Sequence, residues 1–285
     1  MGLSVAAHGG GIVLVGGRSL RMGPAKATLP WHGSTLVRRV VGIVSRGVGG
    51  PVIVVRSPGQ TLPKLPHAFE VLDDVEVGRG PLGGLAVGLE ALAGRCEIAY
   101  VSSTDVPFLH PAFLRLVLSE LGADTDACVP HVRGFRHPLS AAYRTDLAPL
   151  AASMLRGNSL SLSLLLGACR AKELTAEALL ADRALASLDP GLESVTNLND
   201  PSDYDMAIAR PEPLVEVRFD AELSAAPTDS GTKLRAATLG LAARVAGASL
   251  EAGVVVSLNG NELRPDPEVP LVEGDVVSFG GTTKT

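Results

Sequence analysis

The chain has 285 residues, of which 46% are hydrophobic, 19% charged and 4% aromatic, and its formal net charge at pH 7 is −5. This composition is typical of a soluble globular protein, and the lack of a basic excess argues against general nucleic-acid binding. No run approaches the ~20 apolar residues that a membrane helix needs, and the length favours two domains over one.

Short β-branched runs alternate with helical patterns over the first two hundred residues, which is typical of βαβ units and a parallel sheet. In chain order we expect strands at 11–15, 51–55, 68–72 and 97–103, and helices at 34–48, 81–93 and 111–121, the first of them capped by Ser34. Two strands at 127–132 and 139–143 are separated by only a short connection, which predicts that they are antiparallel; helices at 146–155 and 159–166 follow. A last strand at 195–198 precedes a helix with Asp200 as its cap and Pro201 as its first residue.

Pro211 and Pro213 predict a boundary between a domain at 1–210 and a second domain at 214–285. In the second we expect strands at 214–219, 254–258 and 276–279, a helix at 234–245 and a tight turn at Asn259–Gly260. This stretch holds six Lys and Arg residues against ten Asp and Glu residues. The acidity of the chain is therefore concentrated in a small α+β domain.

The three cysteines Cys96, Cys128 and Cys169 are dispersed and form no C-x-x-C pair. They predict reduced core thiols, because neither a disulfide framework nor a zinc site fits this pattern. The first residues lack the basic and apolar regions of a secretory signal. We therefore expect a cytoplasmic protein that contacts no membrane.

A glycine-rich segment with three cations follows the first predicted strand; it runs L-V-G-G-R-S-L-R-M-G-P-A-K from Leu14 to Lys26. Glycine lets backbone N–H groups approach an anion, and Arg and Lys side chains neutralise a polyphosphate. The spacing matches neither the G-x-G-x-x-G dinucleotide pattern nor the G-x-x-x-x-G-K-[ST] phosphate loop. The segment therefore predicts phosphate binding in a different nucleotide fold.

Asp105 follows a predicted buried strand, so we expect its carboxylate in the crevice where α/β sheets bind ligands. It suits Mg²⁺ as a hard oxygen ligand, and a helix N-cap is the alternative. Lys26 and Arg21 would neutralise the charge that develops when an α-phosphorus is attacked and pyrophosphate leaves. The alternative for either cation is a solvated surface charge.

Four segments, in this order, resemble the signature of the molybdenum cofactor guanylyltransferase family: the loop at 14–26, Asp73-Asp74 with G-P-L-G-G-L at 80–85, S-S-T-D-V-P-F at 102–108, and N-L-N-D-P at 197–201. The resemblance covers about residues 10–210. It implies a Rossmann-like nucleotidyltransferase sheet with flanking helices, in an enzyme that transfers GMP from Mg·GTP to molybdopterin and releases pyrophosphate. Mg²⁺ is the implied cofactor, and other molybdenum cofactor biosynthesis proteins or molybdoenzymes are the implied partners.

The resemblance also assigns roles to residues. It implies catalytic roles for Arg21, Lys26 and Asp105, with Asp105 as the metal ligand. It implies nucleotide binding by Leu14, Val15, Gly16, Gly17, Lys26, Arg56, Asp74, Gly80, Pro81, Leu82 and Asp105, and acceptor binding by His137, Asn197 and Asn199. Gly16-Gly17 favours guanine, since cytidylyl relatives tend to carry A-G there. The chain departs from the family pattern at Ala25, where Asp is usual, and at Arg56, where Asn is usual.

Alternatives remain for several of these residues. Asp73 and Asp74 also fit an ordinary turn, and Asn197 and Asn199 fit helix capping. His131, Arg133, Arg136 and His137 fit either the phosphate of the acceptor or a solvated turn. For the whole chain, the alternatives are transfer of CMP, transfer to a sugar phosphate, and a non-catalytic adaptor that delivers the cofactor.

The C-terminal stretch resembles the ubiquitin-like β-grasp sulfur carriers of molybdopterin and thiamine synthesis, on V-S-L-N-G at 256–260 and P-L-V-E-G-D-V-V at 270–277. Such carriers present a free Gly-Gly terminus, whereas Gly280-Gly281 is followed here by four residues, 282–285. The resemblance therefore implies a docking module, or a carrier that a protease trims.

Overall fold

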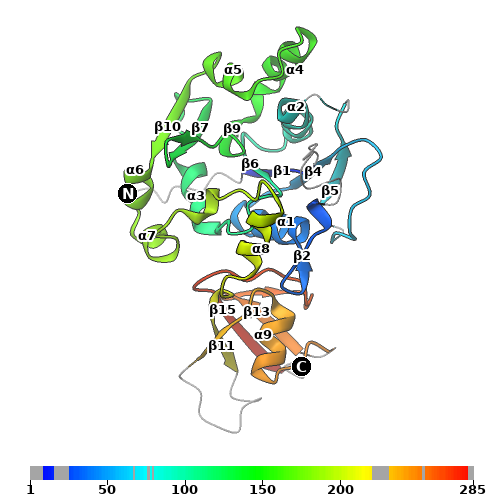
Figure 1. The fold of residues 1–285 in the computed structure, drawn as a ribbon, viewed down its shortest axis with the longest axis vertical. Helices are drawn as coiled ribbons and strands as arrows, with labels where there is room; N and C mark the ends of the chain where they lie inside the picture. The colour runs from blue at the N-terminus through cyan, green and yellow to red at the C-terminus, as the bar shows by residue number, and fades with distance from the viewer. Residues whose placement is uncertain are drawn as a thin grey trace.

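The computed structural model describes residues 9–15, 26–66, 68–75, 78, 80–219, 231–251 and 254–281. Two sheets with separate hydrophobic cores organise the chain (Figure 1). We call residues 9–210 the N-terminal part and residues 214–281 the C-terminal part. Among the described residues, no helix is both long and apolar enough to cross a membrane.

The N-terminal part is built on an eight-stranded sheet in the order β10-β7-β9-β6-β1-β4-β5, with β8 paired to β7. Its strands are β1 (Gly10–Leu14), β4 (Val52–Arg56), β5 (Glu70–Asp73), β6 (Ile98–Ser103), β7 (Ala127–Val132), β8 (Phe135–Arg136), β9 (Ser140–Arg144) and β10 (Ala171–Thr175). β9 runs antiparallel to its neighbours β6 and β7, which agrees with the antiparallel strands predicted at 127–132 and 139–143. In contrast, β1, β4, β5 and β6 are mutually parallel. The predicted mixed α/β sheet is confirmed.

Helices cover both faces of this sheet because alternate strand residues face opposite sides. Ile12 and Leu14 pack towards α2 (Gly80–Leu92), α4 (Ala148–Arg156) and α5 (Leu162–Gly167). Val13 and Val15 pack towards α1 (Leu36–Gly47), α3 (Pro111–Ser119), α6 (Ala176–Leu180) and α7 (Arg183–Leu188). The result is a three-layer α/β/α arrangement, with α8 (Pro201–Ile208) leading out of it.

Two predicted elements are wrong at particular residues. Ser34 does not cap α1, because it pairs with Trp31 in a short hairpin of β2 (Pro30–Trp31) and β3 (Ser34–Thr35), which leaves Thr35 at the N-cap. Residues 195–198 form no strand; a 3-10 helix at Glu193–Val195 leads into a segment without regular secondary structure at 196–199. β10, α6 and α7 were not predicted at all.

The C-terminal part is a five-stranded sheet in the order β12-β11-β15-β13-β14, packed against one helix. Its elements are β11 (Leu214–Phe219), β12 (Thr232–Arg235), α9 (Leu239–Ala246), β13 (Val254–Leu258), β14 (Asn261–Leu263) and β15 (Val276–Gly281). β11 and β15 form a parallel central pair. The helix begins at Leu239 rather than 234, because Leu234 and Arg235 pair with β11 and Thr238 provides the cap. Gly280 and Gly281 belong to β15 and pair with Val255 and Val254.

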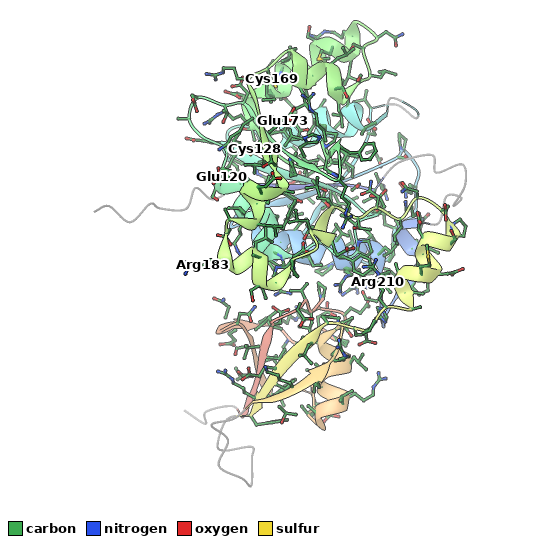
Figure 2. All side chains as sticks on the ribbon, turned by 60° about the vertical axis from the view of Figure 1, so that its left-hand side comes forward. Glu120, Cys128, Cys169, Glu173, Arg183 and Arg210 are labelled. Carbon is green, nitrogen blue, oxygen red and sulfur yellow. The ribbon has the colours of Figure 1, made fainter. Side chains whose placement is uncertain are left out.

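The cysteines are free thiols, as predicted. Cys128 on β7 is fully buried, and burial raises the pKa of its thiol to about 12. Cys169 precedes β10 and is half-buried (Figure 2), like Cys96. Thiols with raised pKa values carry little thiolate near neutral pH, so these cysteines have a packing role.

Candidate active site

The carboxyl ends of β1, β4, β5 and β6 lie along one edge of the large sheet, since these strands are parallel neighbours. Val15, Arg56, Asp74 and Ser103 therefore lie at a common edge. Two hydrogen bonds tie the ends together: Gln60 Nε2 donates to the Val15 carbonyl at 3.4 Å, and the Asp74 N–H donates to the Arg56 carbonyl at 2.8 Å. In α/β sheets this edge is where ligands bind.

The structure brings two predicted catalytic residues into contact at this edge. Lys26 opens a 3-10 helix at Lys26–Thr28, and its Nζ lies 3.3 Å from Asp105 Oδ2. Their side chains are 16% and 22% exposed, so the pair is shielded but reachable from solvent. Ser103 Oγ donates to the other oxygen, Oδ1, and fixes the orientation of the carboxylate. The alternative role of Asp105 as a helix cap is wrong, because His110 caps α3.

A third segment joins this pair through its backbone. The Leu198 N–H donates to the Asp105 carbonyl at 2.8 Å, and Lys26 Nζ donates to the Leu198 carbonyl. Leu198 is buried with Trp31 and Leu36 in a separate small cluster. Three of the four motif blocks thus meet at one point of the sheet edge.

Asn197 and Asn199 flank Leu198 and are exposed. Their side chains form no hydrogen bond with any residue that the structure describes, so they are available to a ligand beside the Lys26–Asp105 pair. Helix capping, the alternative, is carried by Asp200, whose side chain accepts from the backbone N–H groups of Ser202 and Asp203.

At the β4 and β5 ends, Arg56 Nε donates to Asp73 Oδ1 at 2.7 Å, and Arg56 Nη1 donates to the Gln60 carbonyl at 3.0 Å. Asp74 Oδ1 accepts from the Val75 N–H at 2.7 Å. The Arg56 guanidinium is one third exposed, so it can still contact an anion at the open edge.

Gly80 opens α2 at the same edge with a φ of 65°, in the left-handed region that favours glycine. Pro81 follows in the first turn, where its missing N–H costs no hydrogen bond. Leu82 is fully buried, so only its backbone can serve a nucleotide. The side chains of Leu14 and Val15 are likewise buried, and the Val15 N–H donates to the Val55 carbonyl.

The basic residues around the β7–β8 hairpin are held by carboxylates. Arg136 pairs with Glu173, a residue of β10 that is labelled in Figure 2, and Arg133 pairs with Glu193 at 3.0 Å. The Nε2 of His137 lies 3.2 Å from the Val132 carbonyl, and burial lowers the pKa of its imidazole. Through Glu193 this hairpin is tied to the segment that leads to Asn197.

Gly16, Gly17, Arg21 and Ala25 lie outside the described residues. Of the functional groups that the structure does describe, sequence reasoning missed Ser103, Gln60 and the Leu198 backbone. Ser103 ends a predicted strand and could have been found from that position. Gln60 and a backbone carbonyl have no motif that would single them out.

The donor set at Asp105 fits Mg²⁺, which keeps several waters and binds proteins through one or two carboxylates plus substrate phosphates. Among the described residues, no group of three or more His, Cys, Asp or Glu side chains could enclose a metal by itself. A single carboxylate fixed by a serine hydroxyl and placed beside a lysine is therefore suited to a metal that arrives with a polyphosphate.

Comparisons with known proteins agree with this geometry. The family model of the MobA-like NTP transferase domain matches residues 11–169. A protein of Mycobacterium tuberculosis named "Probable molybdenum cofactor guanylyltransferase" is 42% identical over 142 residues, which are 48% of this chain and 69% of the relative. Its counterpart in Mycobacterium avium is 36% identical over 168 residues, covering 58% of this chain and 83% of that protein.

Among solved structures, molybdopterin-guanine dinucleotide biosynthesis protein A from Archaeoglobus fulgidus has the same fold, with a TM-score of 0.54 and 23% identity. The likeness covers 70% of this chain and 96% of that one. The family match extends over more than half of the chain and includes the residues of β1, β4, β5 and β6 that build the site. The chain therefore belongs to the MobA-like NTP transferases and is a nucleotidyltransferase.

Proposed function

We propose that this enzyme transfers GMP from Mg·GTP to the terminal phosphate of molybdopterin, giving a guanine dinucleotide cofactor and pyrophosphate. An acceptor phosphate oxygen attacks the α-phosphorus, and the bond from that phosphorus to the oxygen of the leaving pyrophosphate breaks. The observation that carries the proposal is the convergence of Lys26, Asp105 and Leu198 at the carboxyl edge of the sheet. The names of the mycobacterial relatives support the choice of guanylyl transfer.

Each residue of the site has a physical task in this reaction. Mg²⁺, when bound, neutralises the triphosphate and makes the α-phosphorus more electrophilic. Asp105 holds the metal, and the Ser103 hydroxyl keeps its carboxylate oriented. Lys26 stabilises the charge that develops on the phosphoryl oxygens, because an ammonium group placed beforehand costs no reorganisation during the reaction. Arg56 adds positive charge at the nucleotide end of the edge.

The remaining predicted roles complete the proposal. Gly16, Gly17 and Arg21 would contact the triphosphate and the base, and Asp74 would contact the base or ribose. Gly80, Pro81 and Leu82 would offer backbone to the nucleotide, as would Leu14 and Val15. Asn197, Asn199 and His137 would bind the acceptor; the exposed amides of the two asparagines support this for them, whereas the bonded imidazole of His137 gives it less support.

We also propose that residues 1–210 and 214–285 are two domains, the second a ubiquitin-like β-grasp domain. The parallel central pair of β11 and β15, the strand order and the single helix support the β-grasp assignment. Because Gly280 and Gly281 pair with β13, they are part of the sheet rather than a free tail. This supports a docking module over a sulfur carrier.

Product analysis tests the proposed reaction. The protein is incubated with molybdopterin, Mg²⁺ and equal concentrations of GTP and CTP, and the dinucleotide products are identified by mass spectrometry. We expect the guanine dinucleotide with release of pyrophosphate. A cytosine dinucleotide would contradict the base assignment, and nucleotide binding without pyrophosphate release would contradict catalysis and favour the adaptor.

A further inference from the structure

One face of α1 contacts the C-terminal part. Arg38 pairs with Asp266 at 2.6 Å and with Glu268 at 3.0 Å, more than two hundred residues further along the chain. At Gly42 an added Cβ would lie only 2.7 Å from Pro270, so glycine allows the two backbones to approach closely. This face therefore touches the segment 266–270 of the C-terminal part.

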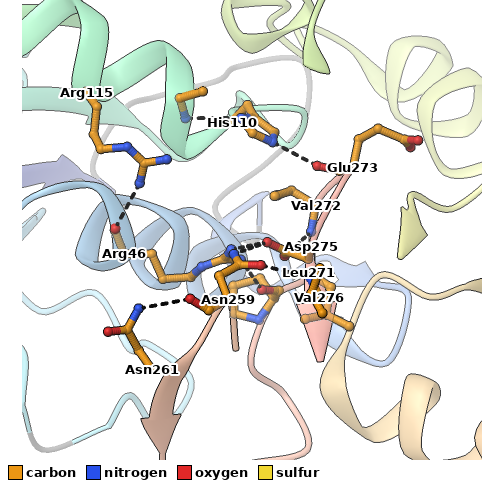
Figure 3. A network of polar contacts seen from close by, with 12 residues as sticks. Arg46, His110, Arg115, Asn259, Asn261, Leu271, Val272, Glu273, Asp275 and Val276 are labelled. Carbon is orange, nitrogen blue, oxygen red and sulfur yellow. Dashed lines mark hydrogen bonds and ion pairs between the residues drawn. The ribbon is translucent and has the colours of Figure 1, made fainter. Parts of the chain in front are cut away.

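The far end of the same face is held by Arg46. Its guanidinium pairs with Asp275, which is 3% exposed and also accepts from Asn259 Nδ2 and the Val272 N–H (Figure 3). Arg46 also donates to the Pro270 carbonyl at 2.8 Å. Contacts of this kind fix the two parts relative to each other.

Between Arg38 and Arg46 lies Arg39, whose side chain makes contacts of a different kind. It is 5% exposed, and its donors go to backbone carbonyls: Nε to Pro107 at 2.5 Å, and Nη1 to Leu271 at 3.2 Å and Ala237 at 3.4 Å. Burial lowers the pKa of the guanidinium to about 10, so it stays charged at neutral pH. A buried cation of this kind must keep its hydrogen-bond acceptors, because losing one leaves a desolvated charge.

Two of those acceptors belong to the C-terminal part, and the third belongs to the turn that carries Asp105. Pro107 stands two residues after Asp105 and is buried. The next residue, Phe108, packs edge-on against Trp31 with ring centroids 5.6 Å apart, and Arg39 lies 5.9 Å from the centre of the Trp31 ring. The turn is thus held at Pro107 by Arg39 and at Asp105 by Lys26 and the Leu198 backbone.

From these contacts we propose that Arg39 is a positioning residue for the turn at Asp105–Pro107. It holds this turn in the geometry that binds the metal, and it does so only while the C-terminal part is docked. If the C-terminal part moved away, the Ala237 and Leu271 carbonyls would leave, water would hydrate the guanidinium, and its bond to Pro107 would no longer be enforced. Anything that binds or displaces the C-terminal part would then alter metal binding at the active site. This inference rests on the proposed function, because it takes Asp105 as the metal ligand.

The test compares two neighbouring arginines in the full-length protein. Arg39→Gln removes the link to Pro107, whereas Arg38→Gln removes two ion pairs between the same parts without touching the turn. Mn²⁺ binding in the presence of GTP is followed by electron paramagnetic resonance, and pyrophosphate release is measured against Mg²⁺ and GTP concentration. The chain's single tryptophan, Trp31, reports by its emission whether the junction is intact in each variant.

We expect Arg39→Gln to weaken Mn²⁺ binding by about tenfold to a hundredfold, the usual effect of removing a group that supports a metal ligand. In the same variant, the Mg²⁺ concentration that gives half-saturation should rise in parallel, and KM for GTP should change less. Arg38→Gln should match wild type within about twofold in all three quantities. Should Arg39→Gln not fold, Arg39→Lys and Arg38→Lys give the same comparison, because one ammonium group cannot reach all three carbonyls.

Unchanged metal binding in Arg39→Gln would overturn the inference, even if the variant unfolds at a lower temperature, because that would show a purely structural role. Equal weakening in the Arg38 and Arg39 variants would overturn it as well, since the effect would then come from docking in general. Absence of pyrophosphate release from the wild-type protein would instead contradict the proposed function. The two failures are therefore distinguishable.

Discussion

Lys26 contacts the proposed metal ligand, since its Nζ lies against both Asp105 and the Leu198 carbonyl. We predict that Lys26→Gln lowers kcat by about a hundredfold to a thousandfold, as expected when one donor to a charged transition state is removed. Stability should change little, because the side chain is partly exposed. Steady-state assays of pyrophosphate release measure the effect.

The matched control is Lys233→Gln, which removes a lysine from the exposed edge strand of the small sheet. It should leave kcat unchanged. If the two variants lost activity equally, or if neither did, Lys26 would have no direct role in the transfer.

At the scale of single residues, the sequence predicts the site where side-chain chemistry carries the role. Asp105 and Lys26 were predicted together from their motifs, and they are in contact. The participation of Leu198 could not be predicted, because it acts through backbone groups that every residue has. His137 was predicted as free for a ligand, whereas its ring lies against the Val132 carbonyl.

At the scale of elements, the start of α3 couples helix capping to pH. His110 Nδ1 accepts from the Ala112 N–H, so Nε2 carries the proton and donates to the Glu273 carbonyl (Figure 3). Burial lowers the pKa of His110 below its usual value of 6.5. The unfolded chain therefore takes up a proton first as the pH falls, and the free energy of unfolding decreases below about pH 6.5.

We predict that His110→Asn reduces this acid-side loss by up to about 1.4 kcal/mol per pH unit, because Asn keeps a capping acceptor but does not titrate. Some loss remains, since the pKa values of His32 and His137 are lowered in the same direction. Urea denaturation between about pH 7.5 and pH 5.5 measures it. An identical pH dependence in both proteins would show that His110 is not the responsible group.

The close contact of α1 with the C-terminal part gives a second prediction for an element. Gly42→Ala should raise helix propensity by about 1 kcal/mol, but its Cβ would lie 2.7 Å from Pro270, and such overpacking costs about 1–3 kcal/mol. The free-energy cost of the clash exceeds the gain in helix propensity, so we expect a lower melting temperature. Calorimetry of the intact protein measures it.

Gly167 is the control for this substitution, because it ends α5 and a Cβ added there would meet no atom within 4 Å. Gly167→Ala should therefore raise the melting temperature or leave it unchanged. Stabilisation by Gly42→Ala as well would contradict a close contact between α1 and Pro270.

At the level of elements, strands with an unbroken apolar run were predicted within about two residues, because a short apolar run bounded by turn residues is typical of a buried strand. The failures have tertiary causes. Residues 195–198 have strand composition, yet the chain there bonds to the Asp105 turn and packs Leu198 into a side cluster. β10 (Ala171–Thr175) is mostly exposed and carries charges, so it has little apolar signal and depends on its partner β7.

At the scale of the whole molecule, the change of pattern after Pro211 predicts the division into two parts, and the two sheets follow it. The way the parts dock could not be predicted. Arg38, Arg39 and Arg46 look like ordinary surface charges of an amphipathic helix. Their partners in the C-terminal part lie 198 to 232 residues away in sequence. Only the folded structure shows that Arg39 of this helix contacts the turn that carries Asp105.

Pyrophosphate release from Mg·GTP in the presence of molybdopterin tests directly whether nucleotidyl transfer takes place at Asp105. Asp146→Asn is the control, because Asp146 is exposed and follows β9, at the opposite edge of the sheet. We predict that Asp105→Asn lowers the rate by at least about a hundredfold and that Asp146→Asn equals wild type. Equal pyrophosphate release by wild type and Asp105→Asn would show that Asp105 does not take part in the transfer.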